Sequence, residues 1–520
     1  MRAVTAAQMR AIDAAAVARE GEVALMRAAG AAIARLIDAT ARAEGAVVAL
    51  AGPGNNGGDA YAALAAYGGT RRRLVYADLG VEGSPARRDA RFRARIAGVE
   101  ERPFPPDPSV LRDAALILDG LLGVNARLPL DPGTAALVEA ATASGAPVLA
   151  LDVPTGIDPS TGAVGSPAIR AAATVALGRP KLGCFLEGGR DATGALWCAP
   201  IGMRDADADG IDDPPSEVLD DAAFAALLPV RSEDAEKRSA GAPLIVAGST
   251  QFPGAAVLAA MGAARAGAGY VTVAAPEGAA AALRAHLIEQ VVVTYKEDDP
   301  AAAVRTILDL TNRCSSIGIG PGLGLSDAFG TIVNGVLAGS DLPAVADAGA
   351  LFHLAKRLGD YRTRPLVLTP HAGEFARLSG QGMIAPGQRL ARLRAFVSEH
   401  GITTLLKGRT TVIGTPAATY LNPTGTSALA TAGTGDVLTG IVATLLAQGC
   451  SPADAARLGA YWHGRAGARA QAARPRGVIA RDVADALGAA ACIGPTDASL
   501  VCLFERADGA GTVAKPGNHM

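Results

Sequence analysis

The stretch from Asn422 to Gly449 constrains the fold most, because it joins a loop rich in glycine and threonine to an apolar helix. Gly433 and Gly435 lack side chains, so the backbone N–H groups of this loop can approach a ligand closely. An apolar run with helical spacing begins near Val437, and the positive end of such a helix favours a phosphate group. Asp436 stands at this anion site, where a carboxylate suits a base or a metal partner. For GTGD alone, a glycine-rich turn that merely starts a core helix is an equally good interpretation.

Length and composition indicate a large globular α/β chain. With 520 residues the chain exceeds one ordinary core, so about two or three domains are expected. Hydrophobic residues are 50% and charged residues 19%, which is a globular composition. Aromatic residues are only 4%, which suits close packing of small side chains between helices and sheets. The net charge is −2 and no basic stripe follows Arg71–Arg73, so nucleic acid is not expected as a partner.

The cysteines and the N-terminal sequence favour a cytoplasmic location. The six cysteines are scattered without a CxxC pair, as expected of reduced thiols rather than a disulfide framework. The sequence MRAVTAAQMRAID reads as the start of an amphipathic helix and not as a signal sequence. Every apolar run of about 18 residues is interrupted by glycine, proline or charge, so no membrane span is expected.

The N-terminal half begins like a doubly wound fold. Two alanine-rich helical patterns precede a buried strand at Ala46–Ala51, which breaks into GPGNNGGDAYAALAAY. A strand, a glycine loop and a helix form the first unit of such a fold, with ligand groups at the carboxyl end of the strand. The loop is neither GxGxxG nor a Walker loop, yet its residues suit a cation and a phosphate-bearing molecule. These residues are Asn55, Asn56, Gly57, Gly58 and Asp59.

Two further predicted strands end at Asp119 and at Asp152. Parallel strands place their carboxyl ends on one edge, so both aspartates are expected to meet Asn56 and Thr155 in one crevice. These side chains offer only oxygen ligands, and no histidine or cysteine stands among them, which points to a hard cation if any metal binds. The alternative is that each aspartate caps a turn or a helix.

Three motifs of this half, GPGNNGGDA, DGLLGVNARLP and LDVPTGIDPSTG, resemble the signature loops of the NAD(P)H-hydrate epimerases. The resemblance covers roughly residues 5–200. It implies a Rossmann-like doubly wound domain and a potassium-dependent interconversion of the R and S forms of hydrated NADH or NADPH. It also implies that Asn56, Asp119 and Thr155 bind potassium and that Asp152 is the acid/base.

The same resemblance implies a set of hydrate-binding residues in two loops and at one strand end. They are Asn55, Asn56, Gly57, Gly58, Asp59, Gly123, Val124, Asn125, Ala126, Arg127, Leu128, Pro129 and Asp152. Two positions depart from the family pattern. Ala60 stands where a glycine is usual, and Val124-Asn125 stands where Thr-Gly is usual.

From Met203 the chain becomes acidic and proline-bearing, which predicts a solvated connector. The run DADADGID lacks the glutamate and the spacing of a calcium-binding EF-hand loop. The expected domains are therefore residues 1–217 and 225–495, followed by a tail at 496–520 without a clear period. The last dozen residues of the tail are expected to be disordered.

In the C-terminal half the alternation of strand, loop and helix resumes, which argues for a parallel sheet between helices. Strands are predicted at Leu244–Ala247, Ser316–Ile319, Ala344–Ala346 and Leu366–Leu368. From Thr403 to Asn422 the pattern becomes strand, turn and strand, which predicts a hairpin.

Five motifs of this half resemble, in order, those of the ADP- or ATP-dependent NAD(P)H-hydrate dehydratases, which are ribokinase-like in fold. They are GSTQFPGA, GIGPGLG, LTPHAGEF, LLKGRTTVI and AGTGDVLTG, within roughly residues 235–490. The resemblance implies that Lys407, Gly408, Arg409, Thr410, Thr411 and Gly435 line the nucleotide. It implies that Ala255, Gly322, His371 and Asp436 face the hydrate. Phe252, where tyrosine is usual, and the run TGTSALATAG depart from the family pattern.

The chemistry of this half is coherent with such a dehydratase. Phosphorylation turns the hydroxyl of a hydrated nicotinamide into a leaving group. Asp436 can take the hydroxyl proton while glycine N–H groups and Mg²⁺ steady the phosphoryl group. Lys407 can neutralise nucleotide phosphate charge, although alone it would read as a surface lysine. Glu374 is expected to cap a helix and is left out of the site.

Two other interpretations stay open at this point. One is a ribokinase-like small-molecule kinase with a nucleotide-binding N-terminal domain. The other is a nucleotide-sensing or scaffold protein whose N-terminal half binds without reacting. For the leading interpretation the expected partners are NADH or NADPH hydrate and ADP or ATP, with no nucleic acid and no membrane, and a homo-oligomer is expected.

Overall fold

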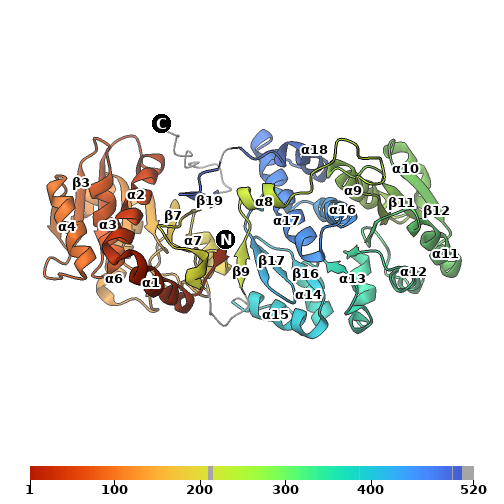
Figure 1. The fold of residues 1–520 in the computed structure, drawn as a ribbon, viewed down its shortest axis with the longest axis horizontal. Helices are drawn as coiled ribbons and strands as arrows, with labels where there is room; N and C mark the ends of the chain where they lie inside the picture. Colours follow the sequence, from red (N-terminus) through yellow and green to blue (C-terminus); the bar gives the residue numbers. More distant parts are fainter. Residues whose placement is uncertain (209–214, 386, 495, 506–520) are drawn as a thin grey trace. The chain divides into compact units, whose positions relative to one another are not determined.

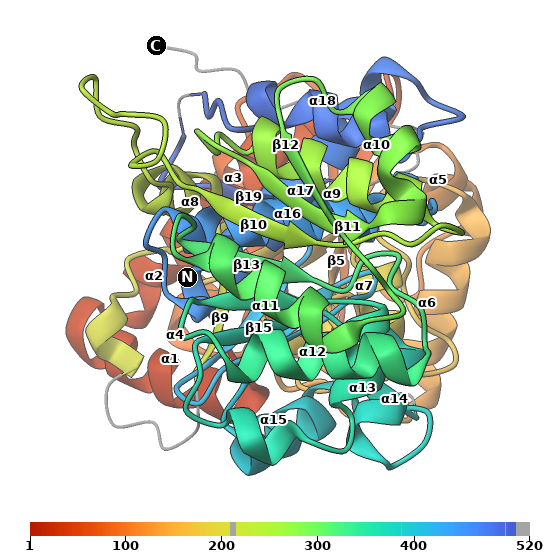
Figure 2. The same cartoon turned by 90° about the vertical axis from the view of Figure 1, so that its right-hand side faces the viewer.

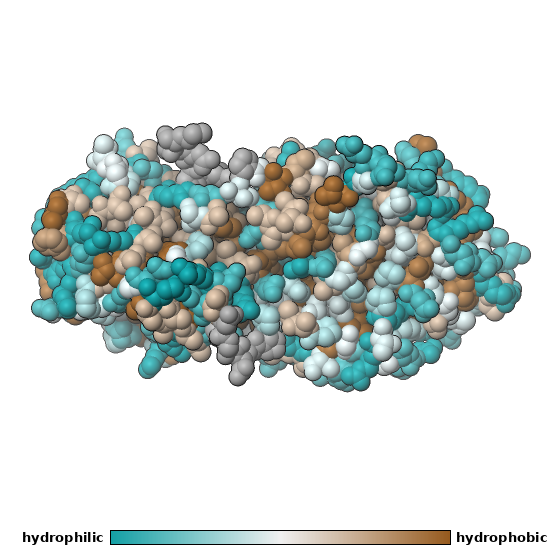
Figure 3. Space-filling view, viewed as in Figure 1, coloured by the Kyte–Doolittle hydropathy of each residue, from teal (hydrophilic) through white to brown (hydrophobic). Residues whose placement is uncertain are grey.

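The computed structural model describes residues 1–208, 215–385, 387–494 and 496–505, which form two compact units (Figure 1). Unit 1 comprises Met1–Asp220 and the chain from Thr496 on, and unit 2 comprises Asp221–Pro495. No helix in these ranges is long and apolar enough to cross a membrane. Figure 3 shows hydrophilic side chains over much of the visible face, with apolar ones scattered among them.

Unit 1 is built on an eight-stranded sheet in the order β19-β8-β7-β6-β5-β2-β3-β4. All neighbours pair in parallel except β19, which is antiparallel to β8. The strands are β2 (Ala46–Ala51), β3 (Arg73–Ala77), β4 (Glu100–Pro103), β5 (Ala114–Gly120), β6 (Val148–Leu151), β7 (Ala173–Leu177), β8 (Ala195–Ala199) and β19 (Val501–Phe504). Two short strands, β1 (Arg2–Ala3) and β9 (Ser216–Val218), pair with each other.

Helices cover both faces of this sheet. The helices of unit 1 are α1 (Ala6–Glu20), α2 (Glu22–Thr40), α3 (Asn55–Ala66), α4 (Pro85–Ile96), α5 (Pro108–Arg112), α6 (Pro132–Ser144) and α7 (Glu187–Ala192), of which α2 to α6 pack on the sheet. Alternate residues of β2 show the two layers, because Val47 packs with α2, α3 and α4 while Val48 packs with α5 and α6. The predicted doubly wound fold is confirmed for this unit.

Unit 2 holds a nine-strand array in the order β18-β17-β16-β15-β14-β13-β10-β11-β12. Its strands are β10 (Pro243–Val246), β11 (Thr272–Pro276), β12 (Val291–Tyr295), β13 (Ser316–Ile319), β14 (Ala344–Ala346), β15 (Leu366–Leu368), β16 (Thr403–Leu406), β17 (Thr411–Gly414) and β18 (Thr419–Asn422). The strands from β10 to β16 pair in parallel, and β16, β17 and β18 form an antiparallel meander rather than the single predicted hairpin.

The helices of unit 2 lie on both sides of these strands, with α9 and α16 on one side and α11 and α12 on the other (Figures 1 and 2). They are α8 (Asp221–Leu227), α9 (Pro253–Arg265), α10 (Ala280–His286), α11 (Pro300–Thr311), α12 (Asp327–Ala338), α13 (Gly349–Leu354), α14 (Ala372–Ser379), α15 (Arg389–His400), α16 (Thr434–Ala447), α17 (Pro452–Ala473) and α18 (Ala480–Ala490). Gly262 and Gly440 let α9 and α16 touch backbone to backbone, since a Cβ on either would lie within 2.4 Å of the other helix.

Four local expectations differ from the structure. The sequence predicts a loop from Asn55 to Asp59, but these residues form the first turns of α3, whose N-cap Gly54 has an extended backbone. Helix α16 begins at Thr434, three residues before Val437. Its N-cap, Gly433, has a positive φ of 89°, so the backbone is not helical before Thr434.

The expected connector and tail also contain short strands. Within the connector, residues 216–218 form β9, and Ser216 is buried where it pairs with β1. Within the tail, residues 501–504 form β19 on the edge of the unit 1 sheet. The last dozen residues, expected to be disordered, lie outside the described residues.

Candidate functional site

The first candidate site lies where the strand order of unit 1 reverses. Strand β2 pairs with β3 on one side and with β5 on the other, so the connections after β2 and β5 leave in opposite directions. Such a switch point opens a crevice at the carboxyl ends of the strands. Asn56 lies in the first turn of α3 directly after β2, and Asp119 is the last residue but one of β5.

Asn56, Asp119 and Thr155 meet in this crevice. The two oxygens of the buried Asp119 carboxyl accept hydrogen bonds from the Thr155 hydroxyl at 2.7 Å and the Thr155 N–H at 2.8 Å. The Thr155 hydroxyl accepts from the Leu122 N–H at 3.2 Å, and the Asn56 amide donates to the Leu122 carbonyl at 2.9 Å. Burial raises the pKa of Asp119 to about 6, although the bonds from Thr155 and Leu121 lower it.

Asp152 follows β6 and forms a buried ion pair with a lysine that the sequence analysis did not identify. Its φ of 72° is uncommon for a residue with a side chain. One carboxylate oxygen contacts the Lys181 ammonium group and accepts from the Leu177 N–H at 3.2 Å. The same ammonium group donates to the Leu177 carbonyl at 2.8 Å, and Lys181 is only 1% exposed. The position of Lys181 shortly after a fourth buried strand is the signal that could have revealed it.

A cavity of about 360 Å³ opens over this ion pair. Its polar lining consists of Asp13, Glu22, Asn55, Asn56, Asp59, Asn125, Asp152 and Lys181, and Gly123 and Val124 also border it. Burial raises the pKa of Asp59 well above its usual value, and the charge of Asp152 adds to the effect. Burial also raises the pKa of Asp13 to about 6, with Lys181 acting in the opposite direction.

Two residues of the predicted hydrate loop serve packing instead of the cavity lining. A Cβ on Gly57 would come within 2.1 Å of the Gly52 carbonyl oxygen, and a Cβ on Gly58 within 2.5 Å of the Met26 side chain. The absence of side chains at these positions therefore lets α3 lie close to its neighbours.

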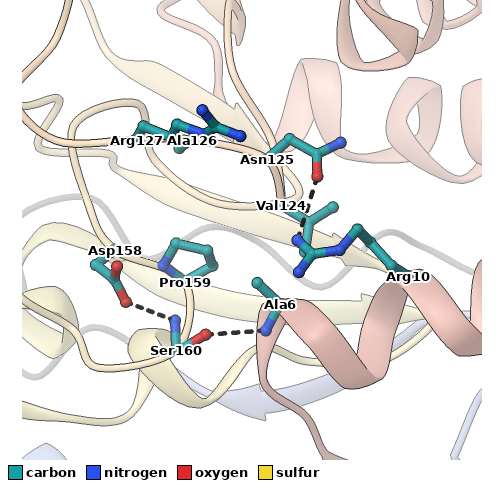
Figure 4. A pocket seen from close by; sticks show the side chains of 9 residues that line it. All are labelled: Ala6, Arg10, Val124, Asn125, Ala126, Arg127, Asp158, Pro159 and Ser160. Carbon is teal, nitrogen blue, oxygen red and sulfur yellow. Dashed lines mark hydrogen bonds between the residues drawn. The ribbon is translucent and has the colours of Figure 1, made fainter.

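A second cavity of unit 1, of about 480 Å³, shares Val124 and Asn125 with the first (Figure 4). Ala126 and Arg127 line it from the predicted hydrate loop, and Arg10 lines it from α1, donating to the Asn125 amide oxygen at 3.4 Å. Leu128 and Pro129, the remaining predicted residues, border neither of these two cavities.

The second candidate site lies at the carboxyl edge of the unit 2 sheet. Lys407, directly after β16, donates to Asp347, directly after β14, at 2.8 Å. The second oxygen of Asp347 accepts from the Thr439 hydroxyl of α16 at 3.1 Å. A Cβ on Gly435 would lie 3.5 Å from the Lys407 ammonium group and 3.6 Å from the Asp347 carboxylate, so the start of α16 lies directly beside this ion pair. Asp347 was not among the predicted site residues, because nothing in the sequence links it to Lys407.

The electrostatics of this edge single out Asp436. It lies in the first turn of α16, where burial raises its pKa to about 7. The charge of Asp347 adds to that shift and the charge of Lys407 opposes it. Burial alone would lower the pKa of Lys407, but the charges of Asp347, Glu374 and Asp436 outweigh it and raise the pKa. A carboxyl that changes charge near neutral pH is well suited to a proton transfer.

The other predicted hydrate residues lie in the first turn of α9 (Ala255) and shortly after β13 and β15 (Gly322 and His371). Ala255 and Gly322 are adjacent, since a Cβ on Gly322 would lie 2.8 Å from that of Ala255. The Nδ1 atom of His371 accepts from the Glu374 N–H at 3.3 Å, while Glu374 accepts from the His371 N–H at 2.8 Å. The predicted capping role of Glu374 at α14 is thus confirmed, and its carboxylate also lies 4.0 Å from Lys407.

The predicted nucleotide residues after β16 lie in one turn. Gly408 packs closely against the Arg389 guanidinium group, where a Cβ would come within 2.3 Å. Thr410 is buried, and its hydroxyl oxygen finds no hydrogen-bond partner within the part of the chain described. Arg409 belongs to the same turn, and Thr411 begins β17.

Two doubly wound α/β units, each with ionisable side chains gathered at the carboxyl edge of its sheet, define a two-domain enzyme. Residues 22–183 match the family model described as YjeF-related protein N-terminus, and residues 243–488 match the model described as NAD(P)H-hydrate dehydratase.

Similar proteins are named as bifunctional repair enzymes. The bifunctional NAD(P)H-hydrate repair enzyme Nnr of Mycobacterium leprae is 38% identical, covering 81% of this chain and 83% of that protein. The enzyme of the same name from Pyrobaculum aerophilum is 35% identical, covering 89% and 92%. A solved structure of ADP/ATP-dependent NAD(P)H-hydrate dehydratase from Bacillus subtilis, co-crystallised with ATP/Mg²⁺, is 31% identical with a TM-score of 0.46, covering 54% of this chain and 98% of that one.

The chain belongs to the family of bifunctional NAD(P)H-hydrate repair enzymes. The predicted fold class and the predicted pair of activities, an epimerase and a dehydratase, are confirmed. The alternatives of a small-molecule kinase and of a non-reacting scaffold do not agree with this membership.

Proposed function

We propose that unit 1 interconverts the R and S hydrates of NADH and NADPH in the cavity at its switch point, with Asp152 as an acid/base. The observation that carries this proposal is the buried pair of Asp152 and Lys181, which borders that cavity at the carboxyl edge of the sheet. Burial of an ion pair costs desolvation free energy and is weak evidence for a role in stability, so a role in positioning a reactive group accounts for this pair better.

The crevice beside this cavity suits a potassium ion. The Asn56 amide oxygen is buried and accepts no hydrogen bond from any described residue, so it is available to a cation. The Asp119 carboxylate and the Thr155 hydroxyl supply further hard oxygen donors next to it. We propose that Asn56, Asp119 and Thr155 hold K⁺, whose charge would help to retain the phosphates of the dinucleotide.

We propose that unit 2 dehydrates the S hydrate at the expense of ADP or ATP with Mg²⁺. Asp436 takes the proton of the hydrate hydroxyl as that oxygen bonds to the transferred phosphorus and the nucleotide leaves. The phosphate then departs with the C–O electron pair, and loss of a ring proton forms the dihydronicotinamide. The N-terminal end of α16 and the Lys407 ammonium group offer positive charge to the phosphates. Mg²⁺ would neutralise further phosphate charge.

We also propose that the two activities belong to separable domains, 1–217 and 225–495, in a cytoplasmic homo-oligomer. The acidic run between them supports the first part of this proposal. All six cysteines are free thiols, which supports a reducing compartment. Size-exclusion chromatography with light scattering measures the oligomeric state.

The decisive experiment supplies an R/S mixture of NADH hydrate with ADP and magnesium and measures both epimers by chromatography. Wild-type protein is expected to consume both epimers. Asp152→Asn is expected to stop R-to-S conversion, with the spontaneous rate subtracted, while the S form is dehydrated normally. Asp89→Asn, a change of an ion-paired carboxylate on α4, serves as the matched control.

Two results would contradict the two parts of this proposal. If Asp152→Asn clears the R form as fast as the control, the cavity of unit 1 is not the epimerase site. If a larger organic cation replaces potassium without slowing the conversion, the assignment of Asn56, Asp119 and Thr155 falls separately.

A further inference from the structure

The cavity over Asp152 has a second carboxyl, Asp13 of α1, which belongs to none of the three motif loops. The N-terminal end of this helix is held in place twice. Thr5 and Gln8 form a capping box, and the Ser160 hydroxyl accepts the Ala6 N–H at 2.9 Å. The next turn buries Met9 at 2% exposure, so α1 presents Asp13 to the cavity from a fixed position.

Asp13 and Asp152 differ in what they touch. Asp152 contacts the Lys181 ammonium group, which holds its carboxylate in place. Within the described part of the chain, the Asp13 carboxyl makes no hydrogen bond and no ion pair. It reaches the cavity from a helix, whereas Asp152 reaches it from the sheet edge. A ligand between them would meet carboxyl groups on two walls.

Inversion of the hydrate at its carbinol carbon needs two proton-transfer groups. A donor gives a proton to the hydroxyl as the C–O bond breaks, and the ring nitrogen supplies the electron pair that forms a C=N bond. The water released is replaced by water that attacks the other face, and the C=N pair returns to nitrogen. An acceptor then takes the proton of that water. Nothing is consumed, and the two groups exchange roles in the reverse direction.

We propose that Asp13 and Asp152 are the two proton-transfer groups of this epimerisation, and that Lys181 is a positioning residue that holds Asp152. This inference rests on the proposed function of unit 1.

Asp13 suits the role better than the other carboxyls of the cavity. The ionisable groups that face it are Glu22, Asp59, Asp152 and Lys181. Burial raises the pKa of Asp59 well above its usual value, and the charge of Asp152 adds to this effect, so the neutral form of Asp59 is favoured. With a pKa of about 6, Asp13 can both give and recover a proton in that range. Glu22 accepts a hydrogen bond from the Asn55 amide at 2.8 Å and is therefore already engaged.

The first test measures the rate of R-to-S conversion by full-length Asp13→Asn from pH 5 to pH 9, with Asp89→Asn as the control. Asp13→Asn is expected to lower kcat about 100-fold with KM within about twofold, and to remove the pH dependence near pH 6. Dehydration of pure S hydrate by the same sample should be normal, which shows that unit 2 is intact.

The second test separates positioning from stability at Lys181. Lys181→Met is expected to lower kcat, because the Asp152 carboxylate then has no cation to hold it beside the cavity. The acid limb due to Asp13 should move to higher pH, because the charge of Lys181 lowers the pKa of Asp13. Lys181→Arg retains the charge and should recover part of the rate. A purely structural lysine would instead lower the melting temperature and leave the pH profile of the folded fraction unchanged.

Each outcome decides one point. If wild-type protein epimerises and Asp13→Asn retains its rate within about threefold, the inference is wrong while the proposed function stands. If wild-type protein shows no conversion above the spontaneous rate, the proposed function itself fails first.

Discussion

Replacement of Asp436 by asparagine should stabilise unit 2 above neutral pH while it stops dehydration. Burial, together with the charge of Asp347, raises the pKa of Asp436 from 3.8 to about 7. At 1.36 kcal/mol for each pKa unit, the ionised carboxylate of the folded state carries a penalty of about 4 kcal/mol. The N-terminal end of α16 offsets up to about 1 kcal/mol of this penalty, which leaves about 3 kcal/mol.

The sign of the pH dependence follows from the raised pKa. The folded state holds the proton more tightly than the unfolded state, so this contribution to stability is fully present below about pH 4. It is lost as the pH rises through about 7. Asparagine is neutral throughout, so Asp436→Asn should match wild-type protein at pH 4 and exceed it at pH 8. The expected rise in melting temperature at pH 8 is about 5 to 10 °C.

Scanning calorimetry of the full chain at several pH values tests this prediction. The melting transition of unit 2 is the one whose temperature rises when ATP is added. Asp485→Asn on α18, whose carboxylate forms an exposed ion pair with Arg265, is the control and should change stability by less than about 0.5 kcal/mol. If Asp436→Asn melts at or below the wild-type temperature at pH 8, the ionised Asp436 carboxylate does not destabilise the folded state and the reasoning is refuted.

Three further predictions concern unit 2. For dehydration of pure S hydrate by wild-type protein, kcat/KM should fall about tenfold for each pH unit below 7. Asp436→Asn should lower kcat/KM about a thousandfold at pH 8 and show no such fall below pH 7. A flat wild-type profile contradicts the base role. Gly440→Ala should lower the free energy of unfolding measured in urea by about 3 kcal/mol, because its Cβ would lie 2.0 Å from a carbonyl oxygen of α9. The control is Gly488→Ala, whose Cβ would meet nothing within 4 Å and which should be neutral or stabilising. A fragment of residues 221–495 should fold alone and dehydrate only the S hydrate. A shorter fragment that lacks α8 should be less soluble, because Phe224 of α8 is completely buried. Equal solubility of the two fragments would show that α8 is dispensable.

The buried strands were the most predictable part of the fold. The bounds of β2, β13, β14 and β15 agree with the sequence prediction to the residue. Parallel strands covered on both faces form continuous apolar runs, and glycine, aspartate or proline lies within two residues of the end of each of these four strands. The convergence of Asn56 and Asp119 followed from the same logic, because it needs only the carboxyl ends of neighbouring strands.

Contacts between distant segments could not be predicted from local patterns. Lys181 lies 29 residues from Asp152, and Lys407 lies 60 residues from Asp347. No spacing rule connects such pairs, since the fold alone brings them together. The helical start at Asn55 was missed for a related reason, because tertiary packing of α3 overrides the poor helix propensity of asparagine and glycine.

The return of the chain to unit 1 through β19 has a consequence for synthesis. Unit 1 contains segments from both sides of unit 2 in the sequence, and β8 gains its outer neighbour only from residues 501–504. On the ribosome, β8 therefore keeps a free edge until the whole of unit 2 has emerged. An unpaired edge can recruit another strand, so the nascent protein passes through a period in which association with other chains competes with completion of its own sheet.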